Sequence, residues 1–220
     1  MSSDTSLNSR KDNGGRWLLL AEGVILFVGL PLLMFWDLIP LPKITVLIIA
    51  AVYCGYQLWG DPAFGRGLLR RDSNSTITQS LLIRTPLVIA GVVGLVWLLH
   101  PERFFVFPTE RPVTWMVVMV LYPVLSALPQ EFIFRTFFFH RYGDFMSLRY
   151  APIVTSALAF GFVHIIYDNW WAVGLGFLGG LLFGITYART KSLFWVTVEH
   201  AIYGCLVFTI GMGDYFYEPF

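Results

Sequence analysis

The sequence predicts an all-α bundle of membrane-spanning helices. The chain of 220 residues is 56% hydrophobic and only 13% charged, and its mean hydropathy of +0.66 leaves too little polar surface for a soluble domain of this length. Apolar stretches of bilayer-spanning length recur along the chain, and many of its aromatic residues flank them. A net charge of +1 without a basic patch argues against nucleic-acid binding.

Seven apolar segments approach the length that a bilayer of about 30 Å requires. The first follows a polar stretch, residues 1–16, which we expect to be disordered and cytoplasmic. This first segment is long and has no small-residue cleavage site, so we expect it to stay as an anchor. A short aromatic tail, residues 213–220, follows the last segment. The seven segments are 17–36, 43–60, 79–99, 112–142, 151–167, 170–188 and 192–212.

The fourth segment is too long for a single vertical span. It contains Pro123 and Pro129, so we expect it to be kinked, tilted or split. Pro129 suits the first turn of a new helical piece, with Ser126 as a nearby cap. Glu131 would then lie close to a helix N-terminus, where the helix dipole favours the ionised carboxylate.

The distribution of basic residues favours a cytoplasmic N-terminus and an external C-terminus. Ten Lys and Arg residues fall on the side of the N-terminus and three on the other, whereas Arg84 and Arg135 lie inside segments. An eighth span or a re-entrant segment is the alternative that would reverse the C-terminal part. The ten are Arg10, Lys11, Arg16, Arg66, Arg70, Arg71, Arg141, Arg149, Arg189 and Lys191, and the three are Lys43, Arg103 and Arg111.

Three further features are not assigned to a site. The sixth segment carries Gly176, Gly180 and Gly184 at four-residue spacing, which predicts close approach of another helix. Arg84 lies a few residues inside the third segment, so we expect its side chain to extend to the cytoplasmic surface. On the seventh segment, the side chain of Glu199 points about 100° away from that of His200, so we expect Glu199 to face away from a site that contains His200.

Three segments carry ionisable groups at positions where charge is costly. Glu131 and Arg135 are one helical turn apart in the fourth segment and can pair, while His164 and His200 lie in the fifth and seventh. Counted from the expected cytoplasmic ends, their depths are about 16 Å for Glu131, 20 Å for His164 and 13 Å for His200. We therefore expect one polar site between the fourth, fifth and seventh segments. The alternative is a structural ion pair with two core histidines.

The order of these residues resembles the motifs of the CPBP family. This family comprises CAAX proteases and bacteriocin-processing intramembrane proteases, also called Abi or type II CAAX prenyl endopeptidase-like proteins. Its pattern is Glu-Glu-x-x-x-Arg, Phe-x-x-x-His and His-x-x-x-Asn. The resemblance implies that residues 17–111 are N-terminal transmembrane helices and that residues 112–212 form a catalytic core. The corresponding runs here are Gln130-Glu131-x-x-x-Arg135, Phe160-x-x-x-His164 and His200-x-x-x-Gly204.

The resemblance also implies roles for these residues in peptide-bond hydrolysis. Glu131, supported by Arg135 and Gln130, would activate a water molecule, His164 would share in the proton transfer, and His200 would stabilise the oxyanion. Phe160 completes the second motif. The chain departs from the family pattern at Gln130 and at Gly204. Because glutamine takes up no proton at neutral pH, the alternative is a weakened or inactive protein that serves as a membrane scaffold or chaperone.

Cofactor and partner expectations follow from the same residues. Glu131, His164 and His200 would make a two-histidine, one-carboxylate zinc set, but a zinc hydrolase usually needs a separate base. We therefore expect a metal-free site and keep zinc as the alternative; a haem between the two histidines is a remoter hypothesis. The expected partners are the lipid bilayer and a membrane-embedded or lipidated peptide. The expected location is a bacterial inner membrane, because the small soluble content resembles the bacterial members.

Overall fold

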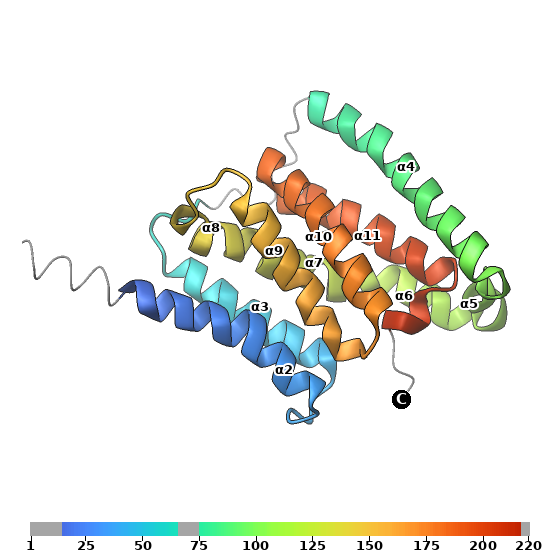
Figure 1. Ribbon diagram of the computed structural model, residues 1–220, viewed down its shortest axis with the longest axis horizontal. Helices are drawn as coiled ribbons and strands as arrows, with labels where there is room; N and C mark the ends of the chain where they lie inside the picture. Colours follow the sequence, from blue (N-terminus) through green and yellow to red (C-terminus); the bar gives the residue numbers. More distant parts are fainter. Residues whose placement is uncertain (1–14, 66–74, 217–220) are drawn as a thin grey trace, which may run out of the picture.

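The computed structural model describes residues 15–65 and 75–216, and all regular structure in these residues is helical. Figure 1 shows a bundle of mostly antiparallel helices, with α4 at one edge. Most of the stretch predicted to be disordered, residues 1–14, and the end of the tail, 217–220, lie outside the described residues. The helices are α2 (Leu30–Phe35), α3 (Lys43–Trp59), α4 (Ser75–Leu99), α5 (Val106–Glu110), α6 (Pro112–Tyr122), α7 (Leu128–Glu131), α8 (Phe138–Tyr142), α9 (Ala151–Val163), α10 (Trp170–Thr190) and α11 (Leu193–Thr209).

The apolar helices coincide with the seven predicted segments to within a few residues. Four of them are long and apolar enough to cross a membrane: Gly15–Phe35, Leu81–Leu99, Pro112–Phe145 and Trp170–Thr190. Three shorter apolar helices are Lys43–Trp59, Ala151–Tyr167 and Leu193–Thr209. The first helix already includes residues 15 and 16, which were expected to be disordered. The prediction of a helical membrane bundle is confirmed, whereas the number of spans stays a prediction.

The fourth segment is one continuous but irregular helix, Pro112–Phe145, so the alternative that it is split into two helices is wrong. Two π-helical segments, Pro123–Ala127 and Phe132–Phe137, interrupt its α-helical pieces. Ala127, which precedes α7, keeps helical dihedral angles of φ −61° and ψ −49°, so no new helix begins there. Ser126 therefore caps nothing, and Glu131 lies inside the helix rather than at an N-terminus. π-Helical segments are frequent at functional sites, and here one precedes the first motif and the other overlaps it.

Helices α9 and α10 pack closely through the glycine stripe, as predicted. A Cβ built on Gly180 would lie 3.0 Å from the Cα of Ala157, and one on Gly184 would lie 3.0 Å from a methyl group of Ile153. A Cβ on Gly176 would lie 2.8 Å from Nδ1 of His164. Only hydrogen at these positions allows this approach. The stripe therefore fixes where the end of α9, and with it His164, stands.

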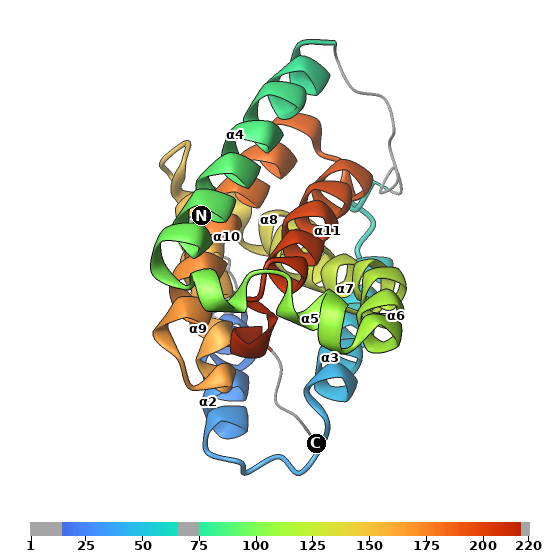
Figure 2. The ribbon, with the colours of Figure 1, turned by 90° about the vertical axis from the view of Figure 1, so that its right-hand side faces the viewer.

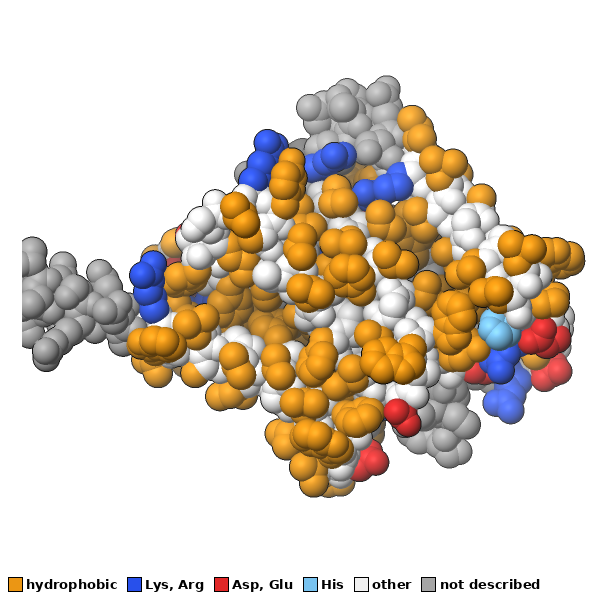
Figure 3. Space-filling model, viewed as in Figure 1, with side chains coloured by type: hydrophobic (Ala, Val, Ile, Leu, Met, Phe, Trp, Pro, Cys, Tyr) orange, Lys and Arg blue, Asp and Glu red, His pale blue; other side chains and the backbone are white. Residues whose placement is uncertain are grey.

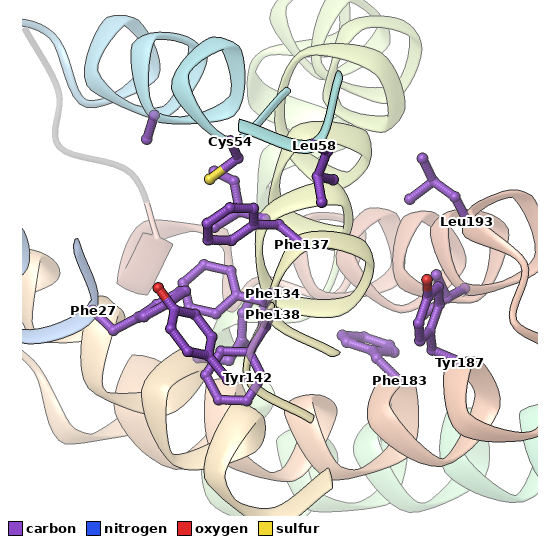
Figure 4. Close-up of a cluster of buried hydrophobic side chains, with 14 of the residues drawn as sticks. Phe27, Cys54, Leu58, Phe134, Phe137, Phe138, Tyr142, Phe183, Tyr187 and Leu193 are labelled. Carbon is purple, nitrogen blue, oxygen red and sulfur yellow. The ribbon is translucent and has the colours of Figure 1, made fainter. Parts of the chain in front are cut away.

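Aromatic rings hold the first helix against the fourth segment (Figure 4). The ring of Phe27 lies 5.4 Å from that of Phe134 in a tilted arrangement, and 5.2 Å from that of Phe138 and 6.0 Å from that of Tyr142 in edge-to-face arrangements. Lipid is as apolar as these side chains, so their contribution comes from close packing more than from removal from water. Two members of this cluster, Phe27 and Phe134, also line the pocket of the candidate active site.

The outer surface is largely apolar, as a bilayer requires (Figure 3). Figure 2 shows α4 at the edge of the bundle. It is held by Arg84, which pairs with Glu199 of α11 at 2.5 Å and donates to Thr186 of α10. The expectation that Arg84 extends to the cytoplasmic surface is wrong. A charge within a membrane helix is cheaper when it faces a counter-charge inside the bundle.

Candidate active site

A pocket of about 480 Å³ lies between the first helix, α3, the fourth segment and the end of α9. Its walls are mainly apolar, and they include Leu30, Met34 and Leu47. The polar lining residues within the bundle are Ser126, Gln130 and His164. Two charged residues also line the pocket: Asp37, in the loop between α2 and α3, and Lys43, at the start of α3. Largely apolar pockets with a few convergent polar groups are typical of ligand sites.

His164 lines this pocket, and its ring is held in one tautomer. It follows α9 and begins a short 3₁₀ turn, His164–Tyr167. Its Nδ1 lies 2.6 Å from the carbonyl oxygen of Phe160, and because a carbonyl only accepts, Nδ1 carries the hydrogen. In the neutral ring the lone pair is then on Nε2. Helix geometry thus sets both the tautomer and the orientation of His164.

Gln130 is the residue of the first motif that lines the pocket. Its Nε2 donates to Ser126 Oγ at 2.7 Å, one helical turn earlier. This bond fixes the amide plane and leaves Oε1 as an acceptor and the second amide hydrogen as a donor. The amide can therefore orient a water molecule or donate to an oxyanion.

Glu131 lies next to Gln130 in sequence but outside the pocket lining. Its side chain has no exposure, and it forms an ion pair with Arg135 at 3.2 Å between Oε2 and Nε. Oε1 accepts a hydrogen bond from Nδ1 of His200 at 2.7 Å. Both carboxylate oxygens thus face other protein groups, and Glu131 is not part of the pocket lining.

Arg135 is a buried charge with partners on three helices. Its side chain is fully buried, and it donates to Ser156 Oγ at 2.8 Å and to the carbonyl of Gly180 at 3.3 Å. The guanidinium carbon also lies 5.0 Å from the ring centre of Phe160. A buried ion pair is stable only when its remaining hydrogen-bonding groups are satisfied in this way. Arg135 therefore ties the fourth segment to α9 and α10.

Tyr122 is a site residue that sequence reasoning missed. Its hydroxyl lies 2.9 Å from Nε2 of His200, so both ring nitrogens of that histidine are engaged. Tyr122 precedes Glu131 by nine residues, which would place it on the opposite face of an ideal α-helix. The π-helical segment Pro123–Ala127 between them alters that register. A hydroxyl inside an apolar segment was the one available signal.

Gly204 and Tyr122 are spatially complementary. A Cβ built on Gly204 would overlap the Tyr122 ring and its hydroxyl. The phenol thus occupies the space into which a side chain at position 204, asparagine in the family pattern, would project. The departure at Gly204 is therefore coupled to the presence of Tyr122 on the fourth segment.

Phe160 separates the two histidines. Its ring lies 4.9 Å from that of His164 and 5.6 Å from that of His200, and Phe183 stacks on His200 at 4.5 Å. The predicted site residues are thus gathered around one aromatic ring, but they fall into two groups. His164 and Gln130 line the pocket, whereas Glu131, Arg135, His200 and Tyr122 form a buried network beside it.

A zinc ion bound by Glu131, His164 and His200 does not fit this arrangement. Within residues 15–65 and 75–216, no three His, Cys, Asp or Glu side chains are grouped so that they could hold a metal ion. The carboxylate of Glu131 and both nitrogens of His200 are held by protein partners, and Nδ1 of His164 is bonded to a carbonyl. A ring bound through these nitrogens would have to lose those contacts, which also disfavours a haem ligand role for His200.

The fold and the site define an integral membrane protein with a polar intramembrane site. Residues 112–206 match the family model of type II CAAX prenyl endopeptidase Rce1-like proteins. This match confirms the resemblance drawn from the three motifs, all of which fall within the matched residues. The comparisons with curated proteins and with solved structures gave no match.

Proposed function

We propose that the chain is an intramembrane endopeptidase that hydrolyses a membrane-embedded or lipidated peptide bound in the pocket. The observation that carries this proposal is that His164 and Gln130 line one pocket within a domain of the Rce1-like family. His164 offers an acceptor nitrogen there, and the carbonyl of Phe160 fixes its tautomer. The apolar walls suit a peptide that comes from the bilayer.

In the proposed reaction, His164 Nε2 takes a proton from a water molecule that Gln130 orients. The resulting hydroxide adds to the carbonyl carbon of the scissile peptide, and the amide hydrogen of Gln130 stabilises the oxyanion. Collapse of this intermediate breaks the carbon–nitrogen bond, and the imidazolium returns its proton to the leaving amine. One water is consumed, and one carboxylic acid and one amine are formed.

Glu131 acts as a positioning residue in this proposal, not as the base that the resemblance implies. Its carboxylate neutralises Arg135 and orients His200, and it has no exposure to pocket water. Tyr122 in turn fixes His200 from the other side. The network holds the fourth segment, and so Gln130, in place against α9 and α11. Sites of this kind depend on such a supporting shell.

A second candidate is a membrane scaffold or chaperone that binds the peptide without cleaving it. The observation that favours it is Gln130, which occupies the position of the first glutamate of the family pattern and leaves the inner part of the pocket without a carboxylate. In this case the pocket would keep its binding capacity, and hydrolysis would be absent from the natural sequence.

The two candidates are separated by cleavage of a single-span reporter in proteoliposomes that contain the purified full-length chain. His164→Gln should lower cleavage by about 100-fold or more, the usual contribution of an acid–base group. His100→Gln changes a histidine outside the pocket lining and should leave cleavage unchanged. Gln130→Glu should raise cleavage because it adds a carboxylate base.

Absence of cleavage by both the wild-type chain and Gln130→Glu, with reporter binding retained, would refute the endopeptidase and support the scaffold. Cleavage that persists in His164→Gln would contradict the role given to the imidazole. Retained reporter binding in His164→Gln shows that a loss of cleavage is not a loss of folding.

A further inference from the structure

The pocket has an open end and a closed end along the bundle axis. Asp37, Leu41 and Pro42, in the loop between α2 and α3, line one end and are exposed. Phe27 and Ala50, which lie deeper along the first helix and α3, are buried and close the other end together with Phe134 and Ile133. Access to Gln130 and His164 is therefore from the end that carries the loop between α2 and α3.

The open end belongs to the side of the bundle that is poor in basic residues. The turn after α9 and the chain beyond α11 also lie there, joined by a hydrogen bond from Asn169 to the carbonyl of Tyr215 at 2.8 Å. The described acidic residues on this side are Asp37, Glu102, Glu110, Asp168 and Asp214. In Figure 3, acidic side chains lie at the lower and right margins, at the right together with some blue Lys or Arg side chains, and further blue side chains lie along the upper left.

The opposite side carries the basic residues. Its described members are Arg16, Arg141, Arg149, Arg189 and Lys191, next to the start of the first helix, the loop before α9 and the turn between α10 and α11. By the positive-inside rule this side faces the cytoplasm. The open end of the pocket then faces away from the cytoplasm.

We propose that the pocket takes its peptide from the non-cytoplasmic side of the membrane, from the outer end of a transmembrane anchor. The proposed function supplies the peptide as occupant; the side of entry rests on the pocket and on the charges alone. The apolar walls match the last residues of an anchor. Asp37 and Lys43 at the open end match the polar residues of either sign that follow an anchor.

The depth of the pocket sets where the reacting bond lies. The lining residues of α3 run from Lys43 to Ala50, a rise of about 10 Å. An extended peptide covers this distance in about three residues. The scissile bond is thus expected about three residues inside the outer boundary of the anchor, and a peptide that remains cytosolic cannot reach it.

The side of entry is tested by cysteine labelling in intact cells with a membrane-impermeant maleimide. Ile166→Cys places a thiol in the pocket wall, and Leu148→Cys places one in the exposed loop before α9. The parent chain, with Cys54 buried and Cys205 partly buried, gives the background. Ile166→Cys should be labelled equally before and after permeabilisation, and Leu148→Cys only afterwards. The reverse order of labelling would overturn the proposed side of entry.

The occupant is tested by disulfide cross-linking of Ile166→Cys to two single-span reporters. One reporter carries a cysteine about three residues inside the outer end of its apolar span, and the other carries it at the mirror position near the inner end. Cross-linking to the outer reporter alone is expected. Equal or preferred cross-linking to the inner reporter would overturn the proposal. Failure of both reporters, with Ile166→Cys labelled from outside, would overturn a peptide as occupant in favour of lipid.

These outcomes are distinct from failure of the proposed function. Labelling and cross-linking need no hydrolysis. An outward-facing pocket in a chain that never cleaves would therefore refute only the proposed endopeptidase activity. If the chain cleaves a reporter but Ile166→Cys is labelled only after permeabilisation, only the proposed side of entry is refuted.

Discussion

Replacing Glu131 with glutamine separates a positioning role from a chemical one. The variant keeps the size of the side chain and keeps an oxygen that can accept from Nδ1 of His200. It removes the negative charge that faces Arg135 at 3.2 Å, while both side chains have no exposure to solvent. The bundle would then hold an uncompensated guanidinium in an apolar surrounding.

The expected cost follows from this burial. Removing one partner of a buried ion pair costs about 3–5 kcal/mol, whereas a single side-chain hydrogen bond within a membrane bundle averages about 0.6 kcal/mol. Loss of the charge therefore outweighs any change in the bond to His200. Adding Arg135→Gln to Glu131→Gln leaves a neutral pair and should recover part of the loss, since no unpaired charge remains.

The assay is unfolding of the purified chain in mixed micelles with increasing denaturing detergent, followed by tryptophan fluorescence. Cleavage of the reporter is measured on the folded fraction of each variant. We expect Glu131→Gln to lower the free energy of unfolding by about 3 kcal/mol or more, with part of the cleavage activity kept by the folded molecules. A loss of less than about 1 kcal/mol together with complete loss of cleavage would refute this reasoning and make Glu131 the base.

Three further predictions concern packing and charge in the same bundle. Gly204→Ala should destabilise the fold by about 1–3 kcal/mol because its methyl group overlaps the Tyr122 ring, and Tyr122→Ala in the same chain should relieve that overlap; equal stability of Gly204→Ala and wild type in the detergent titration would contradict the complementarity. Tyr122→Phe should lower reporter cleavage without weakening reporter binding, because it frees Nε2 of His200; an unchanged turnover number would remove Tyr122 from the site. Arg84→Met should destabilise the bundle more than Arg84→Met combined with Glu199→Gln, because the single variant leaves Glu199 unpaired inside the bundle, and a thermal-stability ranking in the opposite order would refute the tether of α4.

Local spacing was sufficient for part of the site. Glu131 and Arg135 are one turn apart, and they pair as predicted because the contact lies within a single helix. The glycine stripe of α10 predicted close packing because small residues at four-residue spacing always leave a groove on one helix face. Both inferences needed only the geometry of one element.

Long-range contacts explain the failures. Arg84 pairs with Glu199 and Thr186, which are more than 100 residues away in sequence. The placement of their helices beside α4 could not be predicted from the sequence, so Arg84 was expected to extend toward the cytoplasm instead. Tyr122 was missed because a π-helical segment changes the register of its helix, and no residue pattern announced that segment.

The sequence by itself determined that the chain is a helical membrane protein, which segments are helical, and which ionisable residues lie among them, because hydropathy and helical period are local properties. Only the tertiary structure decided which motif residues share a space. Gln130 and His164 line the pocket, while Glu131 and His200 are enclosed with Arg135 and Tyr122. The physical reason is that neighbouring residues on a helix point in different directions, so the packing of the other helices, not the spacing along the chain, selects which side chain meets the pocket.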